Sequence, residues 1–437
     1  MSFRFKIHRG TKEIGGSCVE IWTLNTKIII DFGMPLVDAQ GDEFDFTGFH
    51  DLPTAELIRL GVLPDITGLY HGSDKMADGV IISHSHQDHY GLISYIDKQV
   101  QFYLGEATHK LIELNNQFTN QNIHLSRTHY FQSSKPFTIG DFTITPFLND
   151  HSAFDAYSFL VESGGKSLFY SGDFRSHGRK GRAFRWFIHN APKNVDYLLL
   201  EGTSVTRETI TYKSENDIEK ELRNAFKQSD KINLIYTSGQ NIDRLTSIYK
   251  ACRKSGKTLV VDVYVAAVLK TLSAYGNIPF PSEKFKDLKV IYPYYTSRRL
   301  KNNGNPDVLY RFKEYKITKQ QITENHNNIV MVVRPSMQKD LEHIKGIDGG
   351  NLIYSLWTGY LQKTETRKFI DYLINDRGFH MVEIHTSGHA DTSALKDYVK
   401  AIQPRNIVPI HTFGGQDYQY IFQESIVMLK DGDVIKV

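Results

Sequence analysis

The hexapeptide His84-Ser85-His86-Gln87-Asp88-His89 directly follows a short apolar run, Val80-Ile81-Ile82-Ser83, and this stretch decides the predicted fold. Such a run is typical of a buried strand, and a strand that ends and turns presents the next side chains at a sheet edge. Imidazoles suit zinc, and a carboxylate can hold a second ion. A lone histidine here would usually be a packed, hydrogen-bonded residue. Because four ligand-type side chains crowd into six positions, the stretch predicts a metal centre.

Three further candidate ligands each follow an apolar stretch elsewhere in the chain, namely His151, Asp173 and His411. Any one of them alone is more often a solvated residue in a loop at a strand end. Because all three share the context of the hexapeptide, we expect them to close the metal centre.

The sequence contains two kinds of residue pattern, one typical of strands and turns and one of alternating strands and helices. The first part is mostly short apolar or alternating stretches separated by Gly, Asp and Asn, which is typical of strands and turns. From about residue 206, helix-like and strand-like segments alternate, which favours a parallel sheet, and the weakly patterned stretch 292–321 is expected to be largely helical. The last part returns to short strands. We therefore expect an α/β insert in a strand-rich body, with segments 1–205, 206–370 and 371–437.

The composition is that of an ordinary globular protein, with 40% hydrophobic and 23% charged residues. A net charge of +3 neither requires nor excludes a polyanionic partner. The two cysteines, Cys18 and Cys252, lie too far apart for a CxxC motif, which excludes a cysteine zinc finger and suits a reducing compartment. The sequence has neither a signal-peptide pattern nor an apolar run of membrane-spanning length, so we expect a cytoplasmic protein without a membrane partner.

With these motifs, the chain resembles the metallo-β-lactamase fold over essentially its whole length. Within that fold it resembles the β-CASP nucleases, such as ribonuclease J and the pre-mRNA 3′-end endonuclease. The most specific motif is the hexapeptide followed by Tyr90-Gly91. The resemblance implies an α/β (α+β) fold, in which a metallo-β-lactamase αββα sandwich carries an inserted α/β β-CASP domain. The active site would lie at one edge between the two sheets.

The resemblance also implies a ligand set by position. The cofactors would be two divalent metal ions, with zinc favoured and manganese as the alternative. The first ion would be held by His84, His86 and His151, and the second by Asp88, His89 and His411, with Asp173 bridging both. Asp31, in Ile30-Asp31-Phe32-Gly33, matches the family's first motif and would support the hexapeptide loop from behind the ligands.

Three catalytic candidates follow from the same resemblance. Glu201, in Leu199-Leu200-Glu201-Gly202-Thr203, resembles motif A and would orient a ligand or the catalytic histidine; the alternative is a simple strand-end carboxylate. His389, in His385-Thr386-Ser387-Gly388-His389-Ala390, resembles motif B and is the candidate acid for the leaving 3′ oxygen. Asp88 would serve in both the metal site and catalysis. His411 matches motif C, where a histidine favours RNA over DNA.

The candidate substrate-binding residues are His385, Ser387, Ser238 and Arg334. The first two belong to motif B and would bind a phosphate. Ser238 lies in a segment, 236–244, that resembles the start of the first β-CASP helix, where backbone amides would face a phosphate. Arg334 would lie at the RNA backbone. A capped helix start and an ordinary surface charge are the alternatives for these two. The basic and aromatic run 175–186 is a weaker candidate for nucleic-acid contact, since most such runs are solvated loops.

The resemblance implies a two-metal phosphodiester hydrolase acting on single-stranded RNA, a ribonuclease J-like exo- and/or endoribonuclease in which a hydroxide between the metals attacks phosphorus. A DNA nuclease of the same superfamily and a small-molecule ester or lactone hydrolase stay open as alternatives. A non-enzymatic binding subunit is disfavoured, because all seven ligands are retained. Little sequence follows His411, so the dimer contacts of the ribonuclease J C-terminal domain are not expected, and a homodimer stays open.

Overall fold

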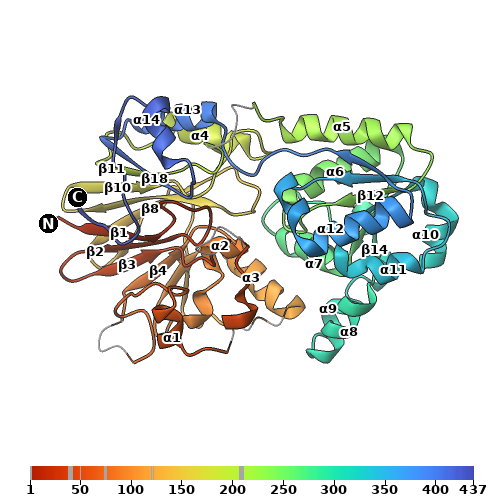
Figure 1. The fold of residues 1–437 in the computed structure, drawn as a ribbon, viewed down its shortest axis with the longest axis horizontal. Coiled ribbons are helices and arrows are strands. Elements are labelled where there is room, and N and C mark those ends of the chain that lie inside the picture. Colours follow the sequence, from red (N-terminus) through yellow and green to blue (C-terminus); the bar gives the residue numbers. More distant parts are fainter. Residues whose placement is uncertain are drawn as a thin grey trace.

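The computed structural model describes residues 2–37, 43–49, 51–72, 76–119, 121, 123–205 and 211–437. These residues form two lobes, on the left and right of Figure 1. The left lobe contains two seven-stranded sheets, and the right lobe contains a six-stranded sheet with helices around it. The expected fold class, a sandwich with an inserted α/β unit, is confirmed.

The first sheet of the sandwich combines antiparallel and parallel strands. Neighbouring strands from β20 through β1 and β2 to β3 are antiparallel, and neighbouring strands from β3 to β6 are parallel. In spatial order the strands are β20 (Val434–Lys436), β1 (Arg4–Arg9), β2 (Cys18–Trp22), β3 (Lys27–Ile30), β4 (Gly79–Ile82), β5 (Phe102–Leu104) and β6 (Thr128–Tyr130).

The second sheet is parallel on one side and antiparallel on the other. Strands β10, β11, β18 and β19 run parallel, so their carboxyl ends lie at one edge. In spatial order the strands are β19 (Ser425–Ile426), β18 (Asn406–Ile410), β11 (Tyr197–Glu201), β10 (Lys166–Tyr170), β9 (Tyr157–Ser163), β8 (Phe142–Leu148) and β7 (Phe137–Ile139).

The two sheets pack face to face, and helices cover their outer faces. Apolar side chains such as Phe5 and Ile30 of the first sheet share one core with Phe159 and Leu199 of the second. In a β-sandwich, inward-facing apolar side chains of both sheets interdigitate and form the core that holds the sheets together. The first sheet is covered by α1 (Thr54–Arg59), α2 (Gln87–Tyr90) and α3 (Glu106–Phe118), and the second by α4 (Gly181–Asn190), α13 (Thr392–Ile402) and α14 (Tyr418–Ile421).

The insert is built on a fully parallel sheet, as its strand–helix alternation predicts. Its strands are, in order, β14 (Leu288–Ile291), β13 (Thr258–Asp262), β15 (Ile329–Val333), β12 (Asn233–Tyr236), β16 (Asn351–Tyr354) and β17 (His380–Glu383). One face packs against α5 (Glu215–Gln228), α6 (Ile242–Ser255), α7 (Val263–Leu272), α8 (Tyr294–Asn302) and α9 (Pro306–Tyr310). The other packs against α10 (Lys319–Asn325), α11 (Gln338–Glu342) and α12 (Thr364–Asp371).

The chain leaves the insert after β17. This strand pairs in parallel with β16, and Val382 lies opposite Ile353. The expected return segment from residue 371 includes this strand, although its hydrogen bonds belong to the insert. We therefore propose that the boundary falls after Glu383. No helix in the part of the chain that the structure describes is both long and apolar enough to span a membrane.

Candidate metal centre

Strand ends from both sheets meet at one edge of the sandwich. Asp31 follows β3, and His84 comes just after the neighbouring parallel strand β4. In the second sheet, Asp173 comes just after β10, and His411 directly follows β18. Because parallel strands share a carboxyl edge, their following loops gather there, which is where α/β sheets place their ligands.

Seven ligand-type side chains form two adjoining groups at this edge. Within each group, one ligand atom per residue lies within 4.8 Å of the others. Asp173 lies between the groups: its Oδ2 is 3.2 Å from His89 Nε2 and 3.8 Å from His84 Nε2. Its Oδ1 is 3.9 Å from His411 Nδ1. The groups are His84, His86, His151 and Asp173, and Asp88, His89 and His411.

The buried polar atoms of this cluster fit a metal. His84 Nε2, His89 Nε2 and both carboxylate oxygens of Asp173 are buried without a hydrogen-bond partner among the described residues. Leaving such atoms unpaired is costly, and native interiors seldom do so. Imidazole nitrogens and carboxylate oxygens are the donor set of divalent zinc. The cluster is therefore a site for divalent metal, as its chemistry and its unpaired atoms both require.

Asp31 orients the ligand loop from behind. Its Oδ2 accepts hydrogen bonds from His89 Nδ1 at 2.8 Å, from Ser83 Oγ at 2.7 Å and from Tyr170 Oη at 2.8 Å. Its Oδ1 accepts from the Ser83 amide at 2.7 Å. Because His89 Nδ1 donates to this carboxylate, Nε2 is the nitrogen that faces the cluster. His151 is fixed in the same way, since its Nδ1 donates to the Gly388 carbonyl at 2.8 Å.

We expect Asp31→Asn to weaken metal binding by about 10- to 100-fold, because it removes the carboxylate that fixes the His89 ring. Competition with a chelator of known affinity measures the effect. Asp141→Asn is the matched control, since Asp141 bonds Thr23 in the same lobe away from the cluster. Equal metal affinities of Asp31→Asn and wild type would contradict this role of Asp31.

Burial and neighbouring charges set the protonation of the ligands. Burial lowers the pKa of His84 well below its ordinary value, and it lowers the pKa of His86 to about 4. Burial opposes ionisation of Asp173, but His411 and His89 outweigh it and hold its pKa well below the usual range. Conversely, Asp173 raises the pKa of His89 despite burial. Asp173 also raises the pKa of His411 despite burial, so the site offers neutral His84 and His86 and an ionised Asp173, while a metal would compete with protons at His89 and His411.

His389 lies beside the cluster and next to Glu201. Its Nδ1 is 3.5 Å from Glu201 Oε1 and 3.8 Å from Asp173 Oδ2, and its ring stacks on that of His411. Its side chain is 21% exposed, whereas those of the ligands His84 and His89 are fully buried. His389 is therefore more exposed than His84 and His89, and His86 is also partly exposed. Glu201 is held in turn by the amides of Phe174, Thr203 and Ala390.

Thr203 contacts the candidate ligand His411, although its place in the sequence predicted no role for its side chain. Its hydroxyl lies 2.9 Å from His411 Nδ1, so it orients that ring as Asp31 orients His89. Thr203 is the last residue of the stretch that resembles motif A, so its position could have suggested a role. A threonine near a strand end is too common for its type alone to indicate contact with a ligand.

The four candidate substrate residues are spread over both lobes. Ser387 is buried, and its hydroxyl accepts from the His389 amide at 3.0 Å. His385 lies 3.4 Å from Arg244 on the insert side. Ser238 is exposed before α6, and Arg334 pairs with Asp262 at 2.9 Å. Within the described residues, no hydrogen bond or ion pair joins Ser238 or Arg334 to the ligands, so their substrate roles stay predictions.

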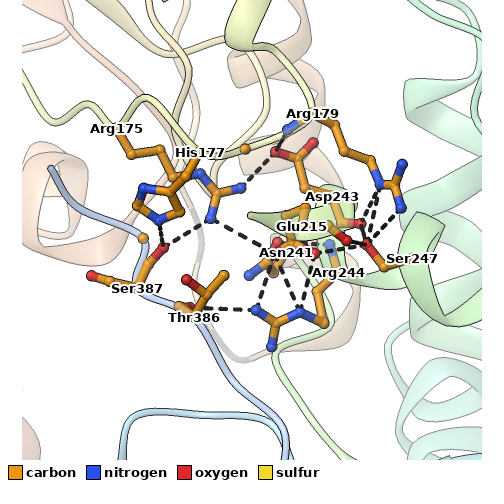
Figure 2. A network of polar contacts seen from close by, with 12 residues as sticks. Arg175, His177, Arg179, Glu215, Asn241, Asp243, Arg244, Ser247, Thr386 and Ser387 are labelled. Carbon is orange, nitrogen blue, oxygen red and sulfur yellow. Dashed lines mark hydrogen bonds and ion pairs between the residues drawn. The ribbon is translucent and has the colours of Figure 1, made fainter. Parts of the chain in front are cut away.

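The basic run 175–186 is buried at its start, whereas Arg182 and Arg185 near its end are exposed. Arg175 is fully buried and donates to Asp243 at 2.6 Å (Figure 2). Arg179 pairs with Glu219 at 2.6 Å. From Gly181 onward the run forms α4, which covers the second sheet. Neither alternative for this run, a nucleic-acid contact or a solvated loop, describes Arg175, because ion pairs inside the protein hold its guanidinium group.

Gly33 allows the hexapeptide loop to lie against the strand end after β3. A Cβ at this position would lie 1.7 Å from the Asp88 carbonyl oxygen and 2.9 Å from the His89 amide. We expect Gly33→Ala to lower the free energy of unfolding by about 1–3 kcal/mol, as overpacking does. Urea denaturation measures this change. Gly48→Ala is the control, because its Cβ meets no atom within 4 Å; equal stability losses in both variants would contradict the steric account.

Comparisons with family models agree with this organisation. Residues 70–223 match the beta-lactamase superfamily domain, and residues 379–424 match the Zn-dependent metallo-hydrolase RNA specificity domain. The first match includes the hexapeptide, and the second includes His389 and His411. The two matched segments lie on either side of most of the insert.

Several proteins are similar to almost the whole chain. Ribonuclease J of Helicobacter pylori is 24% identical over 98% of this chain and 60% of its own length. An RNase J-like protein of Methanocaldococcus jannaschii is 23% identical over 95% of this chain and 93% of its own. A crystal structure of a protein of unknown function from Enterococcus faecalis has the same fold, with a TM-score of 0.76, 22% identity and full coverage of both chains.

The chain thus spans about three fifths of the length of the Helicobacter relative. The chain carries a beta-lactamase superfamily domain and a Zn-dependent metallo-hydrolase RNA specificity domain, and it is similar to ribonuclease J proteins over almost its whole length.

Proposed function

We propose that this chain is a metal-dependent hydrolase that cleaves the phosphodiester bonds of single-stranded RNA. One observation carries the proposal: seven ligand-type side chains surround unpaired buried atoms, and a partly exposed histidine, His389, lies beside them. RNA as substrate is supported by the RNA specificity domain match over 379–424 and by the names of the ribonuclease J relatives.

The site would hold two divalent ions, zinc in the first place and manganese as the alternative. His84, His86 and His151 would bind one ion, and Asp88, His89 and His411 the other, with Asp173 shared. When bound, the ions supply Lewis-acid polarisation of the phosphate and activation of water near neutral pH. Asp31 and Thr203 keep the correct ring nitrogens of two ligands turned toward the ions.

His389 would protonate the leaving 3′ oxygen. Its Nδ1 faces Glu201 and Asp173, which leaves Nε2 as the nitrogen that faces away from these carboxylates and can donate to substrate. Glu201, fixed by three backbone amides, holds the imidazole ring in this orientation. His385, Ser387, Ser238 and Arg334 would contact phosphates along the strand. We keep the cytoplasm as the proposed location, supported by two buried free cysteines.

A substrate comparison tests the proposal. End-labelled single-stranded RNA, DNA of the same sequence and a simple ester or lactone are each incubated with protein loaded with zinc or manganese. We expect RNA to be cleaved fastest. The product ladders of 5′-monophosphate and 5′-triphosphate RNA show whether cleavage starts at the 5′ end. Ester turnover with intact RNA would overturn the proposal, and faster cleavage of DNA would move the substrate to DNA.

A further inference from the structure

A short segment, residues 385–389, connects the insert to the sandwich and carries His389; we call it the strap. It follows β17 of the insert and precedes α13 of the sandwich. The backbone carbonyls of three successive strap residues accept hydrogen bonds from side chains. Figure 2 shows the contacts of Thr386 and Ser387. The Ser387 carbonyl accepts from both Arg175 and His177 at 2.9 Å. The Thr386 carbonyl accepts from Arg244 at 3.3 Å, and the Gly388 carbonyl accepts from the ligand His151.

The donors to the strap come from both lobes. Arg175 and His177 follow β10 of the sandwich, and Arg244 lies in the first turn of α6 of the insert. Both arginines are fully buried. A backbone segment whose consecutive carbonyls are all bonded to buried side chains has little freedom to shift, because each shift would leave a buried polar group unpaired.

Carboxylates at the start of two insert helices neutralise the arginines. Arg175 Nη2 donates to Asp243 Oδ2 of α6 at 2.6 Å, and Arg244 Nη2 pairs with Glu215 of α5 at 3.0 Å. Arg175 also lies 3.7 Å from Glu215. Buried charges of this kind need complete pairing and hydrogen bonding. The guanidinium group of Arg175 thus joins an insert carboxylate on one side to the strap carbonyl on the other.

The far end of the strap holds the proposed acid. The His389 amide donates to Ser387 Oγ at 3.0 Å, and the Ala390 amide donates to Glu201 Oε1 at 3.4 Å. The position of the Ser387 backbone therefore sets where the His389 ring lies relative to Glu201. A displacement of this ring would change a proton transfer that depends on its distance to substrate.

We propose that Arg175 is a positioning residue: by binding the Ser387 carbonyl and the Asp243 carboxylate together, it ties the placement of His389 to the docking of the insert on the sandwich. His177 and Arg244 act on the same strap. The consequence for catalysis rests on the proposed ribonuclease function, whereas the tie between Arg175 and the strap is a property of the folded chain alone.

Arg179 offers a matched control within the same network. Its guanidinium group bonds Glu219, Ser247 and the Asp243 carbonyl. Among the described residues, it makes no hydrogen bond or ion pair with the strap. Lysine keeps the charge but loses the planar fork that binds two partners at once. Arg175→Lys and Arg179→Lys therefore make the same chemical change, and only the first removes a strap contact.

Hydrogen exchange of the strap amides tests the positioning directly. We expect Arg175→Lys to speed exchange at His389 and Ala390 by about tenfold, while Arg179→Lys leaves it within about twofold of wild type. If Arg175→Lys does not fold, His177→Phe takes its place, since it removes a bond to the same carbonyl without leaving a carboxylate unpaired. Equal exchange in the strap variant and the Arg179 variant would overturn the proposal.

Kinetics supply the second readout. We expect Arg175→Lys to lower kcat for RNA cleavage by about tenfold to a hundredfold, with KM within about twofold and metal content unchanged. Equal losses of kcat in Arg175→Lys and Arg179→Lys would reduce the network to a structural role. If wild type cleaves no RNA, the proposed function fails, and the exchange contrast still decides whether Arg175 holds the strap.

Discussion

Asp173→Ala is expected to lose bound metal and RNA cleavage together, with the largest effect of any substitution in the site. Asp173 lies between the two ligand groups, 3.2 Å from His89 and 3.8 Å from His84. Its carboxylate is ionised and buried, and both of its oxygens lack a hydrogen-bond partner among the described residues. Alanine would remove the negative charge that lies between the two groups, so the mutual repulsion of two neighbouring metal cations would be less well compensated.

The expected size follows from what divalent ions contribute to such reactions. Loss of several kcal/mol of transition-state stabilisation lowers kcat/KM by on the order of a thousandfold or more. Metal per chain, measured by mass spectrometry of the purified protein, should fall in parallel. Asp397→Ala, on the exposed side of α13, is the control and should keep both metal and activity. Full metal content in Asp173→Ala would refute a shared ligand at this position.

His389→Ala is expected to keep bound metal and still lose most of the cleavage rate. Removing a general acid typically costs about 10²- to 10⁴-fold in rate. The ring contacts Glu201 and stacks on His411, so its loss leaves the two main ligand groups complete. The measurement is kcat together with metal content.

The same variant separates an acid from a ligand. His389 also lies close enough to Asp173 and His411 to form a third group of potential ligands. A fall in metal content would therefore make His389 a ligand, and wild-type cleavage would exclude it from the reaction. His385→Ala is the control in the same strap, since His385 lies beside Arg244 of the insert and should change KM more than kcat.

The sequence predicted the strands of the fold better than its helices. Strands such as β15 and β18 are continuous apolar runs that packing buries on both faces, so they lie where their pattern predicts. Helix α3 was missed, because it packs on the first sheet and on α7 and therefore buries polar residues such as His109 and Asn115. Such burial on several sides removes the amphipathic pattern that identifies a helix.

Helix α13 shows a second reason for a missed element. Its start carries an ordinary capping signal, since the Asp391 side chain accepts from the Ala394 amide. The expected short strands near the chain end left no place for this helix. Helix α4 was also missed, because it overlaps the run 175–186, whose basic residues suggested a loop. Its apolar residues Phe184 and Phe187 are buried against the second sheet.

The proximity of the seven candidate ligands could be predicted, because most of them come after apolar strands and parallel strands bring such positions to one edge of a sheet. The network around Arg175 could not. Arg175 and Ser387 are 212 residues apart, and their contact depends on how the insert docks on the sandwich. A local pattern contains only a basic residue after a strand, which is more often solvated than buried.

A metal titration shows whether this chain hydrolyses RNA with two bound ions. Protein stripped of metal receives increasing manganese or zinc, and cleavage of end-labelled single-stranded RNA is followed at each ratio of metal to chain. We expect the metal-free protein to cleave no RNA, and we expect the activity to reach a plateau once two ions are bound per chain. Intact RNA at two bound ions, or full cleavage by metal-free protein, would contradict this expectation.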